Sequence, residues 1–419
     1  MEKALLVTVD LESERDKWPL EDVIYELEEL ASACGVEIVD NIVCRRDVLT
    51  ANLFIGKGKA EEVSFACLEQ NVDTVIFSHD LSGTQQRNLE EIIGKKTIDR
   101  TQLILDIFSR HAKSLEGKMQ VELAQLQYLM PRLIGKGIIL SRLGGGVGTR
   151  GPGEQKLEID RRRIRSRIDR LKQDLQNVVL HRRTLKKKRQ ENALPSVVLV
   201  GYTNAGKSTL MNALCGTEQH VKNSLFTTLD TVSRNLQLSN GENVIISDTV
   251  GFLQNLPHHL IEAFKATLEE VSEADLLIHV LDVSHARVSE HAKAVKAVLK
   301  ELGADQNQII TVLNKSDLLE DKVWLRKLVD DFDNSVPISA KLKENFDELL
   351  KKIQEVFQAR MSLIEVLLPH SRMDLLDLFY REGKVRKVDY LDKGVKVEVN
   401  LPKIIISKYL KNIEFRDIR

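Results

Sequence analysis

The sequence predicts a multidomain α/β protein made of four consecutive parts, and three observations lead to this prediction. The chain has 419 residues, enough for two to four domains of about 100–200 residues each. Strand-like and helical patterns alternate in two stretches, as in parallel α/β sheets. Between these stretches the pattern is helical only. We therefore expect an N-terminal α/β domain, a helical hairpin, a larger α/β domain and a small α+β module, over 1–100, 101–192, 195–360 and 361–419.

Short apolar strand patterns alternate with amphipathic helical patterns in the first part. This alternation is typical of a small domain with a mainly parallel sheet. The expected strands are Ala4–Val9, Val36–Val43 and Thr74–Phe77, and the expected helices are Leu20–Ala33, Lys59–Glu69 and Gln85–Ile93.

Two long helical patterns flank a glycine-rich linker in the second part. The first pattern covers Thr101–Leu133, with Pro131 near its end, and the linker over 135–154 contains 8 of the chain's 22 glycines. In the second pattern, apolar residues recur at the spacing of a heptad seam. These residues are Leu157, Ile164, Ile168, Leu171, Leu175, Val178 and Leu185. Together they predict a long antiparallel helical hairpin of the coiled-coil type.

Charge is distributed very unevenly along the chain. The net charge is −1, yet Lys156–Arg189 holds 14 Lys and Arg against 4 Asp and Glu, a local charge of +10. Such a local excess favours a polyanionic partner, usually nucleic acid or an anionic membrane, over a merely solvated coiled-coil face. The candidate residues for binding such a polyanion are Arg150, Arg161, Arg162, Arg163, Arg165, Arg182, Arg183, Lys186, Lys187 and Lys188.

The remaining composition excludes several classes of protein. Apolar residues make up 42% of the chain, which is too many for a disordered protein. No apolar run approaches the roughly 20 residues that a membrane span needs. The four cysteines form no CxxC pair and lack metal-ligand spacing with histidine, which is typical of a reducing compartment. We expect a cytoplasmic monomer without a membrane span.

A phosphate-binding loop opens the third part. An apolar strand over Val197–Val200 precedes a GxxxxGK[ST] motif, and a helical pattern follows it. This strand–loop–helix setting argues against a chance match on a glycine turn. Backbone N–H groups and the helix N-terminus would bind phosphate, Lys207 would reach the β- and γ-phosphates, and Ser208 would coordinate Mg²⁺. The motif consists of Gly201, Tyr202, Thr203, Asn204, Ala205, Gly206, Lys207 and Ser208.

Two further segments fit the γ-phosphate side of such a site. The strand Val244–Ile246 leads to a DxxG motif, in which Asp248 would hold Mg²⁺ through water and the Gly251 N–H would contact the γ-phosphate. Between the two motifs, Thr228 is our choice for the switch threonine that binds Mg²⁺ only when the γ-phosphate is present. The candidate residues here are Phe226, Thr227, Thr228, Leu229 and Asp230, with Asp248, Thr249, Val250 and Gly251.

A base-recognition motif follows the strand Ile309–Leu313. The Asp317 carboxylate can accept from the ring N–H and the exocyclic amine of guanine, whereas adenine would leave it unpaired. The sequence therefore predicts GTP and GDP as ligands. The motif consists of Asn314, Lys315, Ser316 and Asp317, and after the strand Val336–Ile338 come Ser339, Ala340 and Lys341, which would contact the base through the backbone.

Two residues bear on catalysis. Many GTPases orient the attacking water with a glutamine after the DxxG motif, but here that residue is Phe252, so the catalytic group is unknown. Asn204 is similar to the asparagine with which potassium-stimulated GTPases bind K⁺; an asparagine that only stabilises the loop is the alternative.

The fourth part is short and mixed. A strand over Leu363–Leu368 and a helix over Met373–Tyr380 are expected first. A hairpin of Val385–Tyr390 with Val395–Val399 follows, and Pro402–Leu410 would close the module. The order predicts a small α+β unit.

The chain resembles the HflX family of ribosome-associated GTPases, and the motifs outside the nucleotide-binding part are the specific ones. They are Phe54–Lys59, Gln85–Leu89, Asp106–Phe108, Gln120–Leu126 and Gly144–Glu154. Phe252 also fits, because this family is similar to other GTPases with an apolar residue there. The resemblance covers roughly residues 1–360.

The resemblance implies a GTPase that binds the large ribosomal subunit and ribosomal RNA, is stimulated by ribosomes, and splits stalled or idle ribosomes under stress. The family has also been linked to ATP use through its N-terminal domain, but no second GxxxxGK[ST] motif occurs there, so the sequence does not establish ATP use. Two alternatives stay open at this point. One is a GTPase in RNA maturation, such as tRNA modification or ribosomal subunit assembly, and the other is a GTP-gated RNA-binding protein with little hydrolysis.

Overall fold

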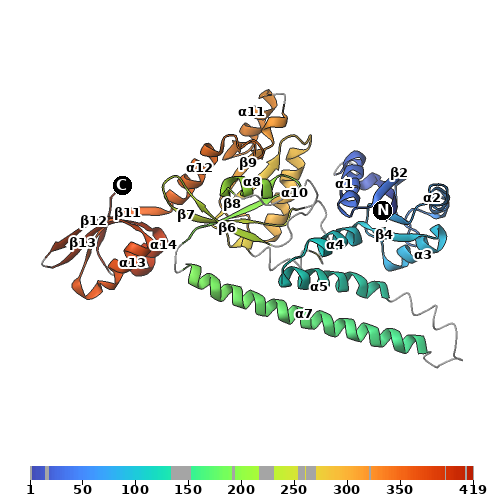
Figure 1. The fold of residues 1–419 in the computed structure, drawn as a ribbon, viewed down its shortest axis with the longest axis horizontal. Coiled ribbons are helices and arrows are strands. Elements are labelled where there is room, and N and C mark those ends of the chain that lie inside the picture. Colours follow the sequence, from blue (N-terminus) through green and yellow to red (C-terminus); the bar gives the residue numbers. More distant parts are fainter. Residues whose placement is uncertain are drawn as a thin grey trace. The chain divides into compact units, whose positions relative to one another are not determined.

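The computed structural model describes residues 2–14, 18–133, 152–190, 194–216, 231–252, 260, 270–319, 322–391, 393–410 and 413–418. The chain forms two compact units, and each is described by itself. The first unit contains Met1–Val179, and the second is built mainly from Leu180–Gln219, Val232–Asp248 and Glu270–Arg419 (Figure 1).

A four-stranded parallel sheet forms the N-terminal part of the first unit, in the order β2-β1-β3-β4. Its strands are β1 (Lys3–Leu11), β2 (Glu37–Arg46), β3 (Thr74–Phe77) and β4 (Lys96–Asp99), with a 3₁₀ turn at Glu12–Glu14. The helices are α1 (Leu20–Ala33), α2 (Lys57–Glu69) and α3 (Gly83–Ile93). The three strands and three helices expected here are confirmed to within a few residues, whereas β4 was not anticipated.

The expected single helix over Thr101–Leu133 is wrong. The segment forms two helices, α4 (Arg100–His111) and α5 (Leu115–Arg132). The chain breaks because Ser114 caps the second helix, its hydroxyl accepting a hydrogen bond of 2.8 Å from the Gly117 N–H. The hairpin therefore consists of α5 and a later helix, and α4 packs with the N-terminal sheet.

The second long helix of the hairpin, α7, spans 39 residues over Pro152–Gln190. Figure 1 shows α5 and α7 side by side in opposite directions. Leu123 of α5 lies in one apolar cluster with Ile168, Leu171 and Leu175 of α7, and Ile164 packs against it, as the heptad predicted. Arg167 donates to Glu122 across the pair at 2.7 Å. Most of the glycine-rich loop 135–154 lies outside the described residues.

A six-stranded, mostly parallel sheet dominates the second unit, in the order β10-β9-β8-β5-β7-β6. Its strands are β5 (Ser196–Gly201), β6 (Val232–Gln237), β7 (Asn243–Asp248), β8 (Leu276–Asp282), β9 (Ile309–Asn314) and β10 (Ser335–Pro337), of which β6 runs antiparallel. The helices are α8 (Lys207–Cys215), α10 (Val288–Glu301), α11 (Lys322–Asp331) and α12 (Phe346–Gln358). α8 and α12 share one core cluster, and α10 and α11 share another, so helices cover both faces.

The C-terminal module is a four-stranded antiparallel sheet with two helices, in the order β12-β13-β11-β14. Its elements are β11 (Met361–Leu368), a 3₁₀ turn at His370–Arg372, α13 (Asp374–Glu382), β12 (Lys384–Leu391), β13 (Gly394–Pro402), α14 (Lys403–Tyr409) and β14 (Phe415–Asp417). The α+β prediction is confirmed, and the order matches the ferredoxin-like βαββαβ arrangement. The short edge strand β14 was not anticipated.

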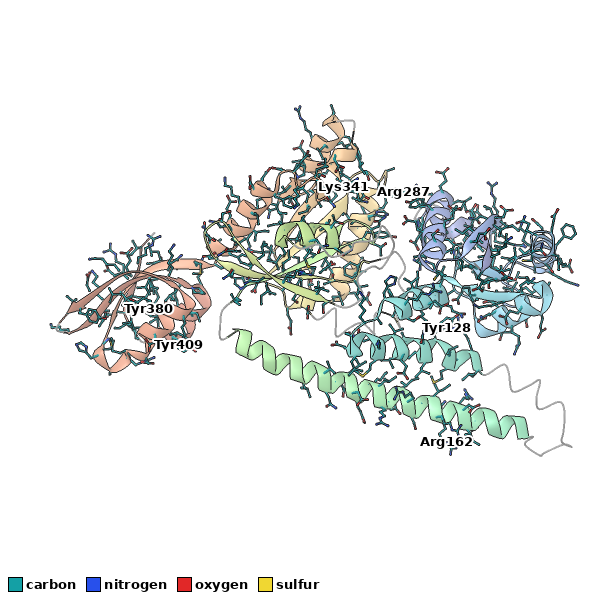
Figure 2. All side chains as sticks on the ribbon, in the orientation of Figure 1. Tyr128, Arg162, Arg287, Lys341, Tyr380 and Tyr409 are labelled. Atoms are coloured by element: carbon teal, nitrogen blue, oxygen red, sulfur yellow. The ribbon has the colours of Figure 1, made fainter. Side chains whose placement is uncertain are left out.

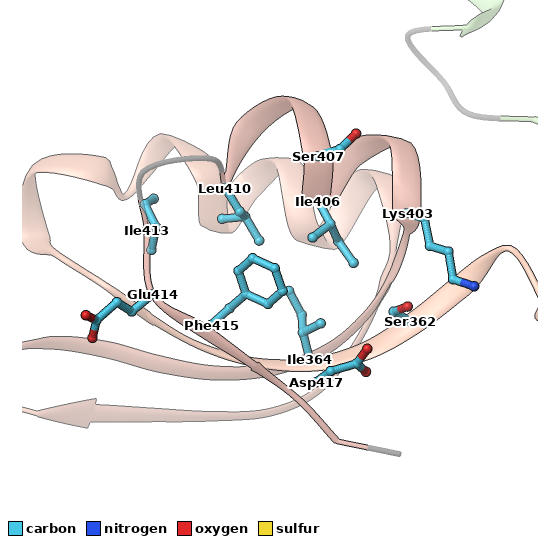
Figure 3. A pocket seen from close by; sticks show the side chains of 10 residues that line it. All are labelled: Ser362, Ile364, Lys403, Ile406, Ser407, Leu410, Ile413, Glu414, Phe415 and Asp417. Atoms are coloured by element: carbon cyan, nitrogen blue, oxygen red, sulfur yellow. The ribbon is translucent and has the colours of Figure 1, made fainter.

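A cavity of about 460 Å³ lies in this module, between α14 and the strands β11 and β14. Its apolar lining consists of Ile364, Ile406, Leu410, Ile413 and Phe415 (Figure 3). None of the nucleotide motifs contributes to it. Elsewhere in the part of the chain that the structure describes, we find no helix with the length and hydropathy of a membrane span.

Candidate nucleotide site

The phosphate loop connects β5 to α8 at the carboxyl edge of the large sheet, where α/β sheets bind their ligands. Two of its glycines are required by close contacts. A Cβ at Gly201 would overlap the Val280 carbonyl oxygen, and one at Gly206 would overlap the Asn314 amide. Gly206 also has a φ of 94°, in the left-handed region that favours glycine. The loop can therefore adopt this course only with glycine at both positions.

Lys207 turns back over its own loop. Its Nζ donates to the carbonyl oxygens of Gly201 at 3.1 Å and Tyr202 at 2.8 Å. Burial of the side chain lowers the pKa of Lys207 to about 8, although the nearby Asp248 carboxylate acts in the opposite direction. An ammonium held in this way lies where the loop would receive phosphate, and a phosphate charge would raise its pKa again.

The two predicted metal ligands meet beside this lysine. Ser208 comes from the first turn of α8 and Asp248 from the end of β7, and the Ser208 hydroxyl donates to Asp248 Oδ2 at 2.5 Å. Asp248 is completely buried. A hydroxyl and a carboxylate give an oxygen-only donor set, which is the kind that Mg²⁺ prefers. The residues present therefore fit a magnesium site at the phosphate loop.

Asn314 joins the phosphate loop to the base-recognition loops. Its Nδ2 donates to the Ala205 carbonyl at 2.8 Å, and its Oδ1 accepts from the Ala340 N–H at 3.0 Å. The side chain is buried at the end of β9. The sequence predicted Asn314 as part of a base motif, but its bridging role depends on contacts between residues far apart in the chain.

The base-recognition segment is fixed by contacts to neighbouring segments, and one of its side chains is exposed. The Ser316 N–H donates to the Ile338 carbonyl at 3.1 Å, which fixes this segment against the one that carries Ser339. Lys315 has a φ of 64° and forms an ion pair of 2.6 Å with Asp282 at the end of β8. Asp317 is exposed, so its carboxylate is accessible to a base. Asp282 was missed by the sequence analysis because it belongs to no motif.

The candidates for contact with the base that follow β10 differ in their solvent exposure. Ser339 and Ala340 are buried, and the Ser339 hydroxyl accepts from the Leu342 N–H at 3.1 Å. Lys341 is exposed (Figure 2). The Ala340 N–H donates to Asn314 Oδ1 at 3.0 Å, so the contact of this segment with a base stays a prediction.

A stack of three rings supports the start of the phosphate loop. Tyr202 lies parallel to His291 of α10, with ring centroids 4.0 Å apart and an interplanar angle of 4°. The ring of His285 also lies against His291, with ring centroids 4.4 Å apart. Burial is the main cause, and the adjacent His285 ring the second, of a pKa of His291 lowered to about 4. This imidazole is therefore neutral near pH 7. No sequence motif pointed to either histidine.

Several predicted site residues lie outside the described residues or carry no described side chain. Phe226, Thr227, Thr228, Leu229, Asp230 and Arg150 lie outside. Thr249, Val250 and Gly251 follow Asp248, and Phe252 is buried. In α7, Arg162, Arg163 and Arg165 are exposed and Arg161 is half-buried. The side chains of Arg182, Arg183, Lys186, Lys187 and Lys188 are not described.

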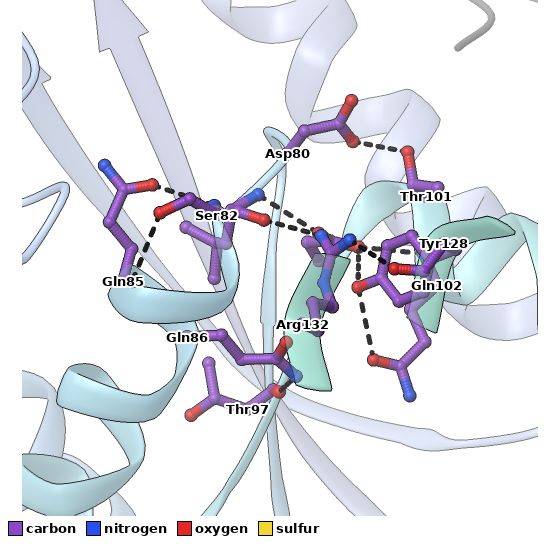
Figure 4. A network of polar contacts seen from close by, with 11 residues as sticks. Asp80, Ser82, Gln85, Gln86, Thr97, Thr101, Gln102, Tyr128 and Arg132 are labelled. Atoms are coloured by element: carbon purple, nitrogen blue, oxygen red, sulfur yellow. Dashed lines mark hydrogen bonds and ion pairs between the residues drawn. The ribbon is translucent and has the colours of Figure 1, made fainter. Parts of the chain in front are cut away.

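A second polar cluster lies in the first unit, where α5 meets the N-terminal sheet (Figure 4). The fully buried Asp99 carboxylate accepts from the Tyr128 hydroxyl at 2.9 Å and from Arg132 at 2.8 Å. It also accepts from the N–H groups of Leu81 and Gln102. Burial raises the pKa of Asp99, which the hydrogen bonds and Arg132 oppose. With four donors already in place, this carboxylate fixes the helix to the sheet.

The fold and the site together define a P-loop GTPase: a doubly wound sheet carries a phosphate loop, adjacent oxygen ligands and a guanine-recognition motif. Three family descriptions match successive parts of the chain. They are "GTP-binding GTPase N-terminal" over 21–109, "GTP-binding GTPase Middle Region" over 111–189 and "50S ribosome-binding GTPase" over 196–315. Proteins described as GTPase HflX are 45% and 38% identical to this chain over 401 and 403 residues, so the chain belongs to the HflX family of GTPases, and it hydrolyses GTP.

Similar proteins cover nearly the full length. The chain is 45% identical over 401 residues to GTPase HflX of Caldanaerobacter subterraneus subsp. tengcongensis, covering 96% of this chain and 91% of the relative. It is 38% identical over 403 residues to GTPase HflX of Escherichia coli, covering 96% and 94%. Among solved structures, a GTP-binding protein from Sulfolobus solfataricus in complex with GDP matches with a TM-score of 0.45 and 23% identity, covering 85% of this chain and 98% of that chain.

Proposed function

We propose that this GTPase is a cytoplasmic, monomeric switch that binds the large ribosomal subunit and splits stalled or idle ribosomes under stress. The observation that carries the proposal is the charge of α7, where Lys156–Arg189 has a local charge of +10. Arg162, Arg163 and Arg165 project this charge into solvent. Ribosomal RNA is a polyanion in which phosphate and shape dominate recognition. The description "50S ribosome-binding GTPase" that matches 196–315 supports the same partner.

Different parts of the chain bind RNA and nucleotide in this proposal. The N-terminal domain over 1–100 and the hairpin over 101–192 contact ribosomal RNA, and the G domain over 195–360 binds GTP and GDP. The C-terminal module over 361–419 receives no role. GTP orders the segment around Thr228, and loss of the γ-phosphate releases it, which changes the RNA-binding pose.

Two cations complete the proposed nucleotide site. Ser208 and Thr228 would hold Mg²⁺ directly and Asp248 would hold it through water, and the metal would supply positive charge against the phosphates. Asn204 would provide a ligand for K⁺. Replacing K⁺ by Na⁺ distinguishes this role from simple loop stabilisation: a potassium ligand makes hydrolysis depend on K⁺, whereas a stabilising asparagine makes it indifferent to the exchange.

Cosedimentation with separated ribosomal subunits tests the proposal. We expect the protein to sediment with the large subunit when a non-hydrolysable GTP analogue is present, and to remain mostly in the supernatant with GDP. The double variant Arg162→Glu/Arg165→Glu should lose this binding, because the reversed charges repel phosphate. Lys351→Glu/Lys384→Glu changes two exposed cations outside the hairpin by the same charge and should bind normally.

Two outcomes contradict the proposal. Equal sedimentation of the two double variants would show that the hairpin does not contact the large subunit. Co-purification with tRNA or an assembly intermediate, in place of mature subunits, would favour a function in RNA maturation.

A further inference from the structure

Thr203, the third residue of the phosphate loop, carries a hydroxyl that the described structure leaves without a hydrogen-bond partner. The residue is 6% exposed, and its Oγ1 is buried and makes no hydrogen bond with any described residue. Buried hydroxyls are almost always paired, because burial without a partner costs free energy. An exception inside a ligand-binding loop indicates that the partner arrives with the ligand.

The position of Lys207 shows which part of the ligand lies nearest. Its Nζ is 2.8 Å from the Tyr202 carbonyl oxygen, and that carbonyl belongs to the peptide bond that joins Tyr202 to Thr203. The lysine of a phosphate loop contacts the β- and γ-phosphates. Thr203 therefore lies next to the ammonium that would contact the β- and γ-phosphates.

The loop around Thr203 is braced on both sides. Before it, Tyr202 is stacked on His291 at 4.0 Å. After it, the Ala205 carbonyl accepts from Asn314 at 2.8 Å. A short segment held at both ends keeps its backbone geometry when the ligand binds, which is what a group that orients a reactant requires. Rotation of the Thr203 side chain about χ1 then brings its buried hydroxyl to the ligand.

The chain also lacks the group that usually orients the attacking water. The residue after Gly251 is Phe252, whose side chain has no hydrogen-bonding atom. A hydroxyl has one donor and two acceptor sites, so it can accept a hydrogen bond from a water molecule while it donates to a phosphate oxygen.

We propose that the Thr203 hydroxyl orients the attacking water against the γ-phosphate, in place of the missing glutamine. This inference rests on the proposed nucleotide site. In the reaction, the water oxygen bonds to the γ-phosphorus as the bond to the β–γ bridging oxygen breaks. GDP leaves with that electron pair, and one proton of the water passes to an oxygen of the inorganic phosphate that forms. Throughout, Thr203 accepts from the water and donates to a γ-phosphate oxygen.

Thr203→Val and Thr203→Ser test this role, because valine keeps the shape and removes the hydroxyl whereas serine keeps the hydroxyl. We expect single-turnover GTP hydrolysis, measured with Mg²⁺ and K⁺ and with large subunits added, to fall about 10- to 100-fold in Thr203→Val. Thr203→Ser should recover most of the rate. GDP affinity should change less than about twofold in both variants, because GDP has no γ-phosphate or attacking water.

A second measurement keeps the test independent of folding. Removing an unpaired buried hydroxyl should stabilise the nucleotide-free protein, so Thr203→Val should raise the thermal midpoint by about 2–4 °C. The matched control is Thr311→Val, in which a buried threonine of β9 away from the loop is changed in the same way. It should hydrolyse GTP at the wild-type rate.

Hydrolysis by Thr203→Val at the wild-type rate would overturn the inference while leaving the proposed site intact. Failure of the proposed site would look different. The wild-type protein would then bind no GDP, or Lys207→Ala would bind it as well as the wild type does.

Discussion

The phosphate loop of the second unit and the Phe54–Lys59 segment of the first unit look alike in sequence and differ in what they can bind. Each places a glycine of positive φ directly before a helix, Gly206 at 94° before α8 and Gly56 at 80° before α2. Each continues with a lysine. Both helices begin at the carboxyl side of a parallel sheet. On these features alone, both would be candidates for anion binding at a helix N-terminus.

The side chains separate the two segments. Lys207 is buried and donates to the carbonyls of its own loop. Lys57 is 75% exposed and faces Glu61 at 3.7 Å. Arg46 lies against Gly56, since a Cβ on this glycine would come within 2.8 Å of its guanidinium, and it also donates to the Ile55 carbonyl. We therefore predict that the segment with Gly206 and Lys207 binds phosphate and that the segment with Gly56 and Lys57 does not.

Removing the lysine in each segment tests this comparison with the largest expected effect. Lys207→Ala should weaken GDP binding by about 100-fold or more, because a charge-assisted contact in a buried site disappears. Lys57→Ala should leave GDP affinity unchanged. Fluorescence titration with a labelled GDP measures both. If the two variants weakened binding equally, the contrast between buried and exposed lysine would fail.

Asp317→Asn sharpens the comparison from the base side, because the first unit has no equivalent motif. The variant should weaken GDP binding about 10- to 100-fold. The amide replaces one carboxylate oxygen with an NH₂ group, which would face a donor of guanine instead of accepting from it. ADP affinity should not fall with it. Competition titrations with GDP and ADP measure the change, and an unaltered preference for GDP would show that Asp317 does not select the base.

The buried lysine also predicts a pH dependence of binding. With a pKa of about 8 for Lys207 in the free protein, the ammonium is mostly charged at pH 7 and mostly neutral at pH 9. A bound phosphate favours the charged form, so binding takes up a proton above pH 8 and affinity falls by about tenfold between pH 7 and pH 9. Calorimetry in two buffers of different ionisation enthalpy should detect this uptake. Equal affinity at the two pH values would contradict it.

The polar cluster of the first unit should have the smallest effect on the nucleotide. Tyr128→Phe removes the hydrogen bond to Asp99 and keeps the ring, which lies 3.4 Å beneath the Arg132 guanidinium. We expect a loss of about 1–2 kcal/mol in the unfolding free energy of the first unit, measured by urea denaturation, with GDP affinity unchanged. A change in GDP affinity would mean that this cluster takes part in nucleotide binding.

Local patterns allowed most of the fold to be predicted from the sequence. Leu20–Ala33 was placed at its true ends because its apolar spacing begins and stops with the helix. The break between α4 and α5 was missed because three residues, Ala112 to Ser114, hardly disturb a helical period. The strand β4 was missed because it has one apolar residue, Ile98, whereas β3, of equal length, has three in a row. The strand β14 was missed because it has only three residues, of which Phe415 alone is apolar.

The site was predictable as far as motifs reach. Ser208 and Asp248 were assigned to one metal from their motifs, and the structure brings them within 2.5 Å. Contacts between residues distant in sequence were not predictable. The bridge from Asn314 to Ala205, the pair of Lys315 with Asp282 and the stack of Tyr202 on His291 arise only when the sheet brings its strand ends together.

GTP turnover in the presence of ribosomal subunits tests the account most directly. The measurement depends both on the nucleotide site, which lacks a water-positioning glutamine, and on the strongly basic hairpin. The account predicts that added large subunits raise turnover of the wild-type protein severalfold or more, and that Arg162→Glu/Arg165→Glu retains its unstimulated rate but is not stimulated. Turnover that stays the same at all concentrations of large subunit would contradict it.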